Sequence, residues 1–314
     1  MHAQRLVGAL HHAGLRVANL DEAAARWQHV LGLHGERVDD RTVILRCTYE
    51  DYALVLTESG DAPGLDYVCY ELAPGVSVDD AARAIAPTGS PVARVTVPLR
   101  GEAVETADPD GHRVRLVPRL VAGDRRPAEV RHSTRIPGWH PRKFGHVNFL
   151  TGDVQRQVHW YTEVLGFRIT DWIGEDGVWL HVDRDHHVLA FLNKGYAHLH
   201  HLAFELVDWG ELRVALDHLA QNRRHIVWGP GRHGMARNLF SYFRMREEEL
   251  FVELFTDLEQ LREDHTPRHF PDDPHSSNTW GILPPRTYFR FDQAALDAED
   301  SQAHAYGQPI PPMP

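Results

Sequence analysis

Cysteine is scarce in this chain of 314 residues, where only Cys47 and Cys69 occur. Two cysteines cannot make the framework of a small disulfide-stabilised secreted protein, and we expect both to be small buried residues. So low a count is typical of a protein kept in a reducing compartment, and a cytoplasmic location is therefore expected.

Long apolar runs and an excess of basic residues are also absent. No stretch approaches the roughly 18 apolar residues of a membrane span, and Met1–Leu10 lacks a basic region followed by an apolar one. We therefore expect neither a membrane span nor a signal peptide. The formal net charge of −11 argues against a nucleic acid or an anionic membrane as a partner.

The composition that is present is that of a globular protein, 42% hydrophobic and 25% charged, with a length that suits about two domains. Histidine is the residue type in excess, with 23 copies. Most of them must be structural or exposed, so their spacing has to identify the functional ones.

The order of residues indicates two homologous halves. Three pairs of segments align at a constant offset of 134 residues: Leu10–Leu15 with Phe144–Phe149, Leu31–Leu33 with Leu165–Phe167, and Tyr67–Leu72 with His201–Leu206. In the last strand the offset has grown by four, and Val114–Leu116 aligns with Val252–Leu254. A register kept over roughly sixty residues predicts an internal duplication.

Each half is predicted to contain a strand, a helix and several strands, twice over. The predicted helices span Leu20–Leu31, Val78–Ala86, Gln155–Leu165 and Trp209–Asn222. We expect a first domain over residues 1–120, a linker over 121–142, a second domain over 143–258 and an extended tail over 259–314. Phe270, Trp280 and Tyr288 predict that part of this tail lies on the body of the protein.

The two halves differ at three corresponding positions. The second half has two histidines and a glutamate, and the first half has a histidine, a tyrosine and an arginine: His146, His201 and Glu253 against His12, Tyr67 and Arg115. Two imidazoles and one carboxylate on one face of a metal leave three coordination positions free, which suits a non-heme Fe(II) oxygenase. A single histidine in a strand is more often structural, and only the joint placement of the three favours a metal site in the second half alone.

Three blocks of the second half resemble type I extradiol catechol dioxygenases, which belong to the vicinal oxygen chelate superfamily. The blocks are Gly145–Asn148, Leu199–Phe204, and the run from Gly229 through Tyr242 to Glu253. The resemblance covers roughly residues 8–258 and implies an α+β fold of four βαβββ modules paired into two domains. It also implies Fe(II), or sometimes Mn(II), in the second domain only, a non-catalytic first domain, and a homo-oligomer, with a tetramer as the expected form.

The resemblance also assigns roles to individual residues. His146, His201 and Glu253 match the metal ligands, and His187 matches the active-site acid–base histidine. A catechol loses protons when it binds a metal, and histidine can accept or return a proton near neutral pH.

Further positions match residues around the substrate. His233 and Tyr242 match a histidine and a tyrosine that hydrogen-bond the substrate and intermediates. The other residues expected around the substrate are Asn148, Trp179, Trp228, Asn238 and His200, and as the first histidine of the pair His200 is expected behind the ligand His201.

The chain departs from the family pattern in two places. The turn before the glutamate strand is replaced by Arg244–Glu249, whose three glutamates we expect to be solvated. Trp228 stands where homoprotocatechuate enzymes carry an arginine for a substrate carboxylate, which argues for an uncharged catechol or trihydroxylated arene, although Arg286 could still supply a cation.

The leading hypothesis is a ring-cleaving dioxygenase in aromatic compound catabolism, which takes a vicinal diol and O2 to a muconic-semialdehyde-type product. A non-oxidative, metal-dependent isomerase or hydrolase of the same superfamily is the alternative, because the scaffold alone does not fix the reaction. A metal-free binding protein of the bleomycin-resistance kind is the third reading, and the ligand set argues against it.

Overall fold

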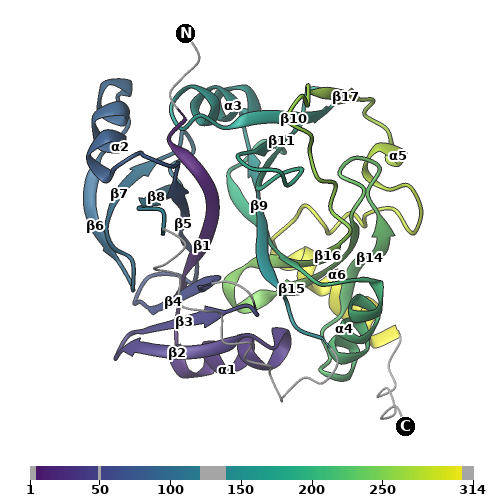
Figure 1. The fold of residues 1–314 in the computed structure, drawn as a ribbon. Helices are drawn as coiled ribbons and strands as arrows, with labels where there is room; N and C mark the ends of the chain where they lie inside the picture. Colours follow the sequence, from purple (N-terminus) through teal and green to yellow (C-terminus); the bar gives the residue numbers. More distant parts are fainter. Residues whose placement is uncertain (1–4, 49–50, 121–138, 306–314) are drawn as a thin grey trace.

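The computed structural model describes residues 5–48, 51–120 and 139–305, which form two curled β-sheets with helices against them (Figure 1). Most of the expected linker, residues 121–138, lies outside the described residues. The predicted α+β class is confirmed. In the described part of the chain, no helix combines the length and apolar character needed to cross a membrane.

The first sheet has eight strands in the order β2-β3-β4-β1-β5-β8-β7-β6. Its strands are β1 (Val7–Val17), β2 (His34–Asp39), β3 (Thr42–Arg46), β4 (Leu54–Glu58), β5 (Gly64–Leu72), β6 (Ala93–Val97), β7 (Gly101–Ala107) and β8 (Arg113–Val117). Helices α1 (Leu20–Leu31) and α2 (Val78–Ile85) follow β1 and β5, and the 3₁₀ turn η1 (Ala86–Thr88) follows α2.

The second sheet has nine strands in the order β14-β15-β16-β13-β9-β12-β11-β10-β17. Its strands are β9 (Lys143–Thr151), β10 (Arg168–Ile173), β11 (Gly177–His181), β12 (Leu189–Asn193), β13 (His198–Glu205), β14 (Ile226–Arg232), β15 (Leu239–Met245), β16 (Leu250–Thr256) and β17 (Arg268–Phe270). Helices α3 (Val154–Glu163) and α4 (Trp209–Gln221) follow β9 and β13, and the 3₁₀ turn η2 (Arg246–Glu248) precedes β16.

The strand orders confirm the duplication. Read from its other edge and without β17, the second sheet has the order of the first, with β9 in the place of β1 and β13 in the place of β5. Each half consists of two βαβββ modules. Two of the β-bulges between the two central strands are also duplicated. The extra residues are His11 and Asp66 in the first half and Gly145 and His200 in the second, again 134 residues apart.

Local signals explain why the helix boundaries could be predicted. The side chain of Asn19 accepts a hydrogen bond from the backbone of Glu22 at the start of α1, and Gly32 ends the helix in the left-handed conformation with φ 68°. In contrast, the sequence signal for β2 is weak. Its sequence is polar and it lies at the edge of the sheet, so it carries little of the apolar alternation that identifies a strand.

The two halves share one hydrophobic core. Trp27 of α1 contacts Phe204 of β13, and Tyr70 of β5 contacts Phe167 before β10. The expectation of a solvated acidic turn is wrong for Glu248, which is buried and forms an ion pair with Arg26 of α1. A buried carboxylate needs a cationic partner, and the opposite half of the chain provides it.

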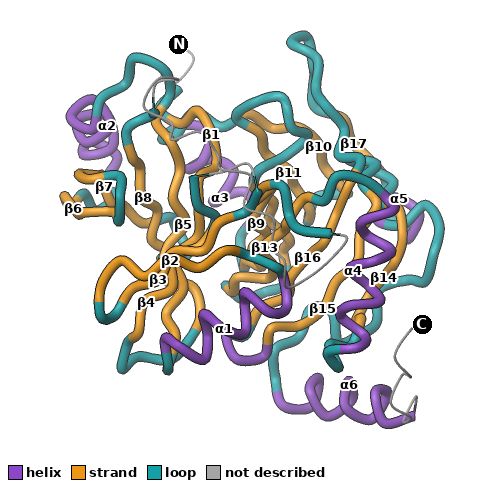
Figure 2. The backbone as a smooth tube through the Cα atoms, turned by 60° about the horizontal axis from the view of Figure 1, so that its bottom comes forward, coloured by secondary structure: helices purple, strands orange, loops and turns teal. Residues whose placement is uncertain are grey.

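The tail is not extended throughout, contrary to the expectation. It adds β17 to the sheet beside β10, forms the short helix α5 (Pro274–Ser277), and ends in helix α6 (Gln293–Ala305), which lies along the lower edge of the molecule in Figure 2. A buried ion pair between Arg244 of β15 and Glu299 fixes α6 to the sheet. The polar sequence of the tail therefore folds through ion pairs with the body, which apolar periodicity does not reveal.

Candidate metal centre

His146, His201 and Glu253 converge on one face of the second sheet. They come from β9, β13 and β16, three adjacent strands with β13 in the middle. Ala203 of β13 pairs in register with His146 on one side and with Glu253 on the other, and His201 lies two residues before it on the same face. The sheet register therefore brings the three predicted ligands together, and all three side chains are buried.

The ligand atoms are spaced as an octahedral ion requires. Glu253 Oε2 lies 2.9 Å from His146 Nε2 and 3.1 Å from His201 Nε2, and the two Nε2 atoms are 3.2 Å apart. Ligand atoms about 2.1 Å from an ion are about 3.0 Å apart at right angles and about 3.4 Å apart at tetrahedral angles. The observed spacings lie nearer to one face of an octahedron.

Hydrogen bonding fixes the tautomer of His201. His200 Nε2 lies 2.7 Å from the carbonyl oxygen of Tyr288, to which it must donate, so the neutral ring accepts at Nδ1. His201 Nδ1, 2.8 Å away, is then the donor, and His201 Nε2 carries a lone pair toward Glu253. Burial lowers the pKa of His201 to about 4, which keeps this ring neutral. A lone pair facing a carboxylate is repulsive, so the site fits a bound cation.

His200 lies behind His201. This residue is the bulge in β13, which brings its Nδ1 next to that of His201 instead of to the opposite face of the strand. It is fully buried between Phe251 and the tail and does not line the pocket. His200 therefore orients the His201 ring and lies outside the pocket lining.

The free oxygen of the glutamate is also held in place. Asn238 Nδ2 donates to Glu253 Oε1 over 2.9 Å, and although burial raises the pKa of Glu253, His146 beside it holds that pKa well below its usual value. Asn238 lines the pocket, but its amide nitrogen is engaged with the glutamate. The carboxylate is thus ionised and fixed in orientation.

His233 and Tyr242 form a second pair beside the ligands. His233 Nδ1 lies 2.6 Å from the carbonyl oxygen of Ser277 and must donate to it, so His233 Nε2 is placed to accept from the Tyr242 hydroxyl at 3.1 Å. The Tyr242 ring is stacked on Trp228, with ring centroids 5.4 Å apart. Burial raises the pKa of Tyr242 well above its usual value, so its hydroxyl keeps its proton.

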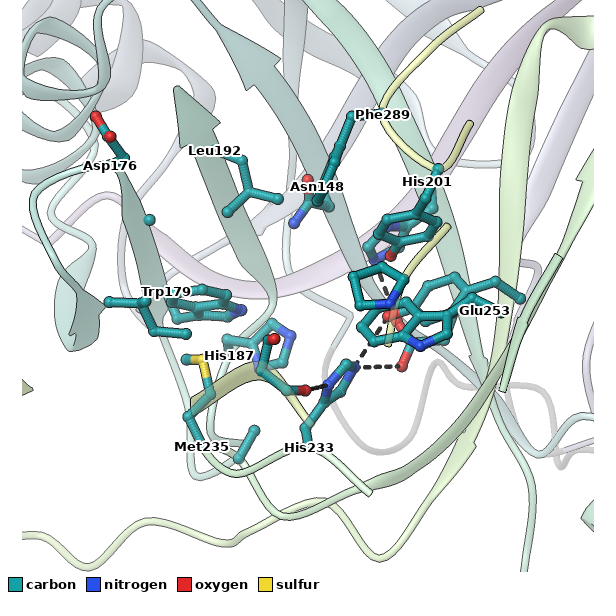
Figure 3. Close-up of a pocket in the computed structure, with 18 of the residues that line it drawn as sticks. Asn148, Asp176, Trp179, His187, Leu192, His201, His233, Met235, Glu253 and Phe289 are labelled. Atoms are coloured by element: carbon teal, nitrogen blue, oxygen red, sulfur yellow. Dashed lines mark hydrogen bonds and ion pairs between the residues drawn. The ribbon is translucent and has the colours of Figure 1, made fainter. Parts of the chain in front are cut away.

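The pocket opens beside the three ligands and extends away from them toward Trp179 and Asp176 (Figure 3). His187 lies on its floor with its ring 4.2 Å from that of His146, measured between centroids. Within the described residues, Asn148 Oδ1 has no hydrogen-bond partner, so this amide can receive a ligand. Trp228 is in the wall, and its indole nitrogen donates to the carbonyl oxygen of Ile282.

Sequence reasoning missed much of the apolar wall and all of its contacts with the tail. The additional apolar lining residues are Ile173, Leu192, Met235, Ala236, Pro284, Tyr288 and Phe289. Arg286 is exposed and is not among the lining residues. The basic residue that does line the pocket is Lys194, whose ammonium lies 4.5 Å from the centre of the Phe289 ring. The one feature of the sequence that indicated contact between the tail and the body was the aromatic content of the tail.

The corresponding positions of the first half are filled by other contacts. His12 Nε2 lies 3.0 Å from the Tyr67 hydroxyl, and the Arg115 guanidinium lies 3.7 Å from the centre of the Tyr67 ring. The side-chain nitrogen and sulfur atoms of His11, His12 and Cys69 also lie within 4.8 Å of one another, close enough to share a metal ion. Burial raises the pKa of the Cys69 thiol, however, and a thiol that keeps its proton is a poor ligand. The guanidinium opposes a second cation at this place.

Comparison with known protein families gives a match over residues 143–249, to the model described as Glyoxalase/Bleomycin resistance protein/Dioxygenase superfamily. That segment contains His146 and His201 but ends four positions before Glu253.

Curated relatives align over more of the chain. A metapyrocatechase of Pseudomonas sp. (strain CF600) is 27% identical over 74% of this chain and 80% of its own length. A manganese-dependent 2,3-dihydroxybiphenyl 1,2-dioxygenase of Geobacillus genomosp. 3 is 25% identical over 78% and 84%. A second metapyrocatechase, from Cupriavidus necator, is 28% identical over 43% of this chain, and the match spans about half of that relative, 47%.

Solved structures share the fold over almost the whole chain. A variant of homoprotocatechuate 2,3-dioxygenase from Brevibacterium fuscum superposes with a TM-score of 0.82 at 23% identity, over 92% of this chain and 83% of that one. A Mn(II)-bound glyoxalase from Novosphingobium aromaticivorans superposes with a TM-score of 0.79 at 24% identity, over 89% and 92%.

Proposed function

We propose that this chain, which carries a domain of the glyoxalase/bleomycin resistance protein/dioxygenase superfamily in its second half, is a metal-dependent extradiol dioxygenase that cleaves a catecholic ring with O2. The observation that carries the proposal is the set of three ligand atoms 2.9–3.2 Å apart at the base of a pocket with an apolar wall. The relatives named metapyrocatechase support the same reaction class.

The metal-binding residues in this proposal are His146, His201 and Glu253. A divalent metal bound there lowers the pKa of a coordinated catechol hydroxyl and brings the diol and dioxygen together. Fe(II) is our first choice and Mn(II) the second, since both accept two histidines and a carboxylate. The manganese dependence of one relative is the reason to test both metals.

The protein's own residues handle the protons. His187 takes a proton from a substrate hydroxyl at its Nε2 atom and returns it later in the reaction. Tyr242 keeps its hydroxyl proton and donates it in a hydrogen bond to His233 Nε2, which fixes the hydroxyl oxygen beside His201. Trp179 and the apolar wall hold the ring and exclude water, and Asn148 offers a free amide oxygen.

The substrate we propose is a catechol or trihydroxylated arene without a carboxylate. Apart from Glu253, three carboxylates line the pocket, those of Asp176, Asp272 and Asp273, against the single cation of Lys194. This balance disfavours an anionic substituent. The wall toward Trp179 instead suits an apolar one.

The first test is anaerobic reconstitution with Fe(II) or Mn(II), followed by addition of catechol, 4-methylcatechol or 2,4,5-trihydroxytoluene. We expect one O2 consumed per substrate and a yellow ring-fission product. Bound metal without O2 uptake on any of the three would contradict the proposal. It would favour instead the non-oxidative alternative, for which the Mn(II)-bound glyoxalase of the same fold is the specific support.

We further propose that the metal is confined to the domain over residues 143–258 and that the first domain, residues 1–120, is non-catalytic. A homotetramer in the cytoplasm is proposed as the working form.

Light scattering of the purified chain tests the tetramer, and a monomer would contradict it. Cell fractionation tests the cytoplasmic location, and a membrane-associated protein would contradict that.

A further inference from the structure

A second pair of adjacent histidines lies next to the pocket, and one of the two, His187, lines it. His186 and His187 lie in the loop between β11 and β12, and both are buried. Their Nδ1 atoms are 3.1 Å apart, and His186 Nε2 lies 2.7 Å from Asp171 Oδ2. The main chain at this point is fixed by Thr170, whose hydroxyl donates to the carbonyl oxygen of His186 over 2.7 Å.

The direction of these hydrogen bonds follows from Asp171, which lies in β10 with no exposed surface. Burial alone would raise the pKa of Asp171, but hydrogen bonds from His186 and from Arg268 lower it below its usual value. An ionised carboxylate only accepts hydrogen bonds, so His186 Nε2 carries a proton and donates it.

One assignment then determines the next. Burial lowers the pKa of His186 in spite of Asp171, so this ring is neutral and its Nδ1 is an acceptor. The contact between the two Nδ1 atoms is a hydrogen bond only if His187 Nδ1 donates. In a neutral ring the remaining nitrogen, His187 Nε2, then has no proton and offers a lone pair.

The pair at His200 and His201 is built in the same way. There the outer histidine donates to the carbonyl oxygen of Tyr288, and the inner histidine presents its Nε2 lone pair to the ligand cluster. Here the outer histidine donates to a carboxylate, and the inner histidine lines the pocket. The same arrangement thus serves a metal ligand in one case and a pocket residue in the other.

We propose that Asp171 and His186 are positioning residues that hold His187 as the tautomer with a protonated Nδ1, so that its Nε2 meets the substrate as a proton acceptor. The tautomer itself does not depend on the reaction. Its use on a catechol hydroxyl rests on the proposed function.

The tail has a defined part in this arrangement. Arg268 of β17 binds Asp171 through Nε at 2.9 Å and through a terminal nitrogen at 2.7 Å, and it also binds Glu259. An isolated carboxylate with no exposed surface would be expected to take up a proton, and Arg268 keeps Asp171 charged. The parallel pairing of β17 with β10 places Arg268 directly opposite Asp171.

The decisive experiment records ¹⁵N spectra of the metal-free full-length protein labelled at histidine. His187 should show a protonated Nδ1 and an unprotonated Nε2. A wild-type His187 with its proton on Nε2 overturns the proposal. Because this measurement needs neither metal nor substrate, it stands even if no catechol is cleaved.

Variants then test the consequence for turnover. His186→Phe removes both ring nitrogens, and Asp171→Asn removes the charge that orders them; each should give a mixture of His187 tautomers. Each should also lower kcat by up to about 10²-fold, the lower range for a lost general base, with bound metal and KM for catechol unchanged. His186→Gln, whose amide can donate to Asp171 and accept from His187, should recover part of the loss.

Glu259→Gln is the matched control, because the Glu259 side chain also binds Arg268 and, within the described residues, forms no hydrogen bond to either histidine. It should leave both the tautomer and kcat close to wild type. Equal losses of kcat in Glu259→Gln and Asp171→Asn would overturn the proposal, since they would indicate a general structural effect. Unchanged tautomer and kcat in His186→Phe and Asp171→Asn would do the same.

Discussion

At the scale of single residues, the hydrogen-bond partner decides what each site histidine can do. His200 and His233 donate to backbone carbonyl oxygens, and His186 donates to a carboxylate. Each bond leaves the other ring nitrogen as an acceptor, which sets the direction of the next hydrogen bond. The chemistry available to a histidine here is thus a property of its neighbour as much as of the imidazole.

The ligand assignment makes the first residue-scale prediction. His201→Ala should abolish both bound metal and turnover, because two remaining ligands cannot hold the ion tightly. His12→Ala, at the equivalent site of the first half, should keep one metal per chain. Metal analysis by mass spectrometry checks both, and a lower metal content in the His12 variant than in the wild type would place an ion in the first half.

His187 gives the second prediction at the residue scale. His187→Phe keeps a ring against His146 but removes the proton acceptor, so the variant should retain metal while kcat falls by about 10²-fold or more. Single-turnover O2 consumption on the reconstituted variant measures this. An unaltered rate with full metal occupancy would exclude His187 from the mechanism.

At the scale of elements, the register of three central strands and the docking of the tail build the site. Ala203 is flanked in register by His146 and Glu253, and the bulge at His200 turns two adjacent side chains toward each other. The tail adds the carbonyl groups of Ser277 and Tyr288 and the guanidinium of Arg268. A tail predicted as extended thus completes the surroundings of three site histidines.

The anchor of α6 gives a prediction for this scale. Glu299→Ala leaves the Arg244 guanidinium buried without its carboxylate, which should lower the free energy of unfolding by about 3 kcal/mol. Asp300→Ala removes an exposed ion pair to Arg246 next to it and should cost less than about 1 kcal/mol. Urea denaturation of the two variants makes the comparison, and equal losses would show that the buried pair is not the anchor.

At the scale of the whole molecule, the excess of histidine becomes a property of stability. Burial lowers the pKa of His12 well below its usual value and that of His181 to about 3, whereas an unfolded histidine titrates near 6.5. Below that pH the unfolded chain binds protons that the folded chain does not. Each such residue therefore costs about 1.4 kcal/mol of stability per pH unit as the pH falls from about 6.5 toward the folded pKa.

This predicts a protein that loses stability from about pH 6.5 downward, above the range in which carboxylates titrate. The free energy of unfolding in urea, measured from pH 7.5 to pH 4.5, should decline throughout the lower part of that range. His181→Gln, which keeps a partner for the Thr170 hydroxyl, should reduce the slope by about one proton. A flat profile down to pH 5 in the wild type would contradict the prediction.

The sequence by itself determined the duplication, the fold class and the grouping of His146, His201 and Glu253, because a repeated register places equivalent residues at equivalent points of equivalent sheets. The roles of the pocket residues stay predictions. Only the tertiary structure decided that a bulge turns His200 toward His201, that Lys194 and not Arg286 lines the pocket, and that His186 binds Asp171. Such contacts depend on single polar groups that can lie far apart in the sequence: Arg268, which binds Asp171, follows it by 97 residues. No periodicity in the sequence records them.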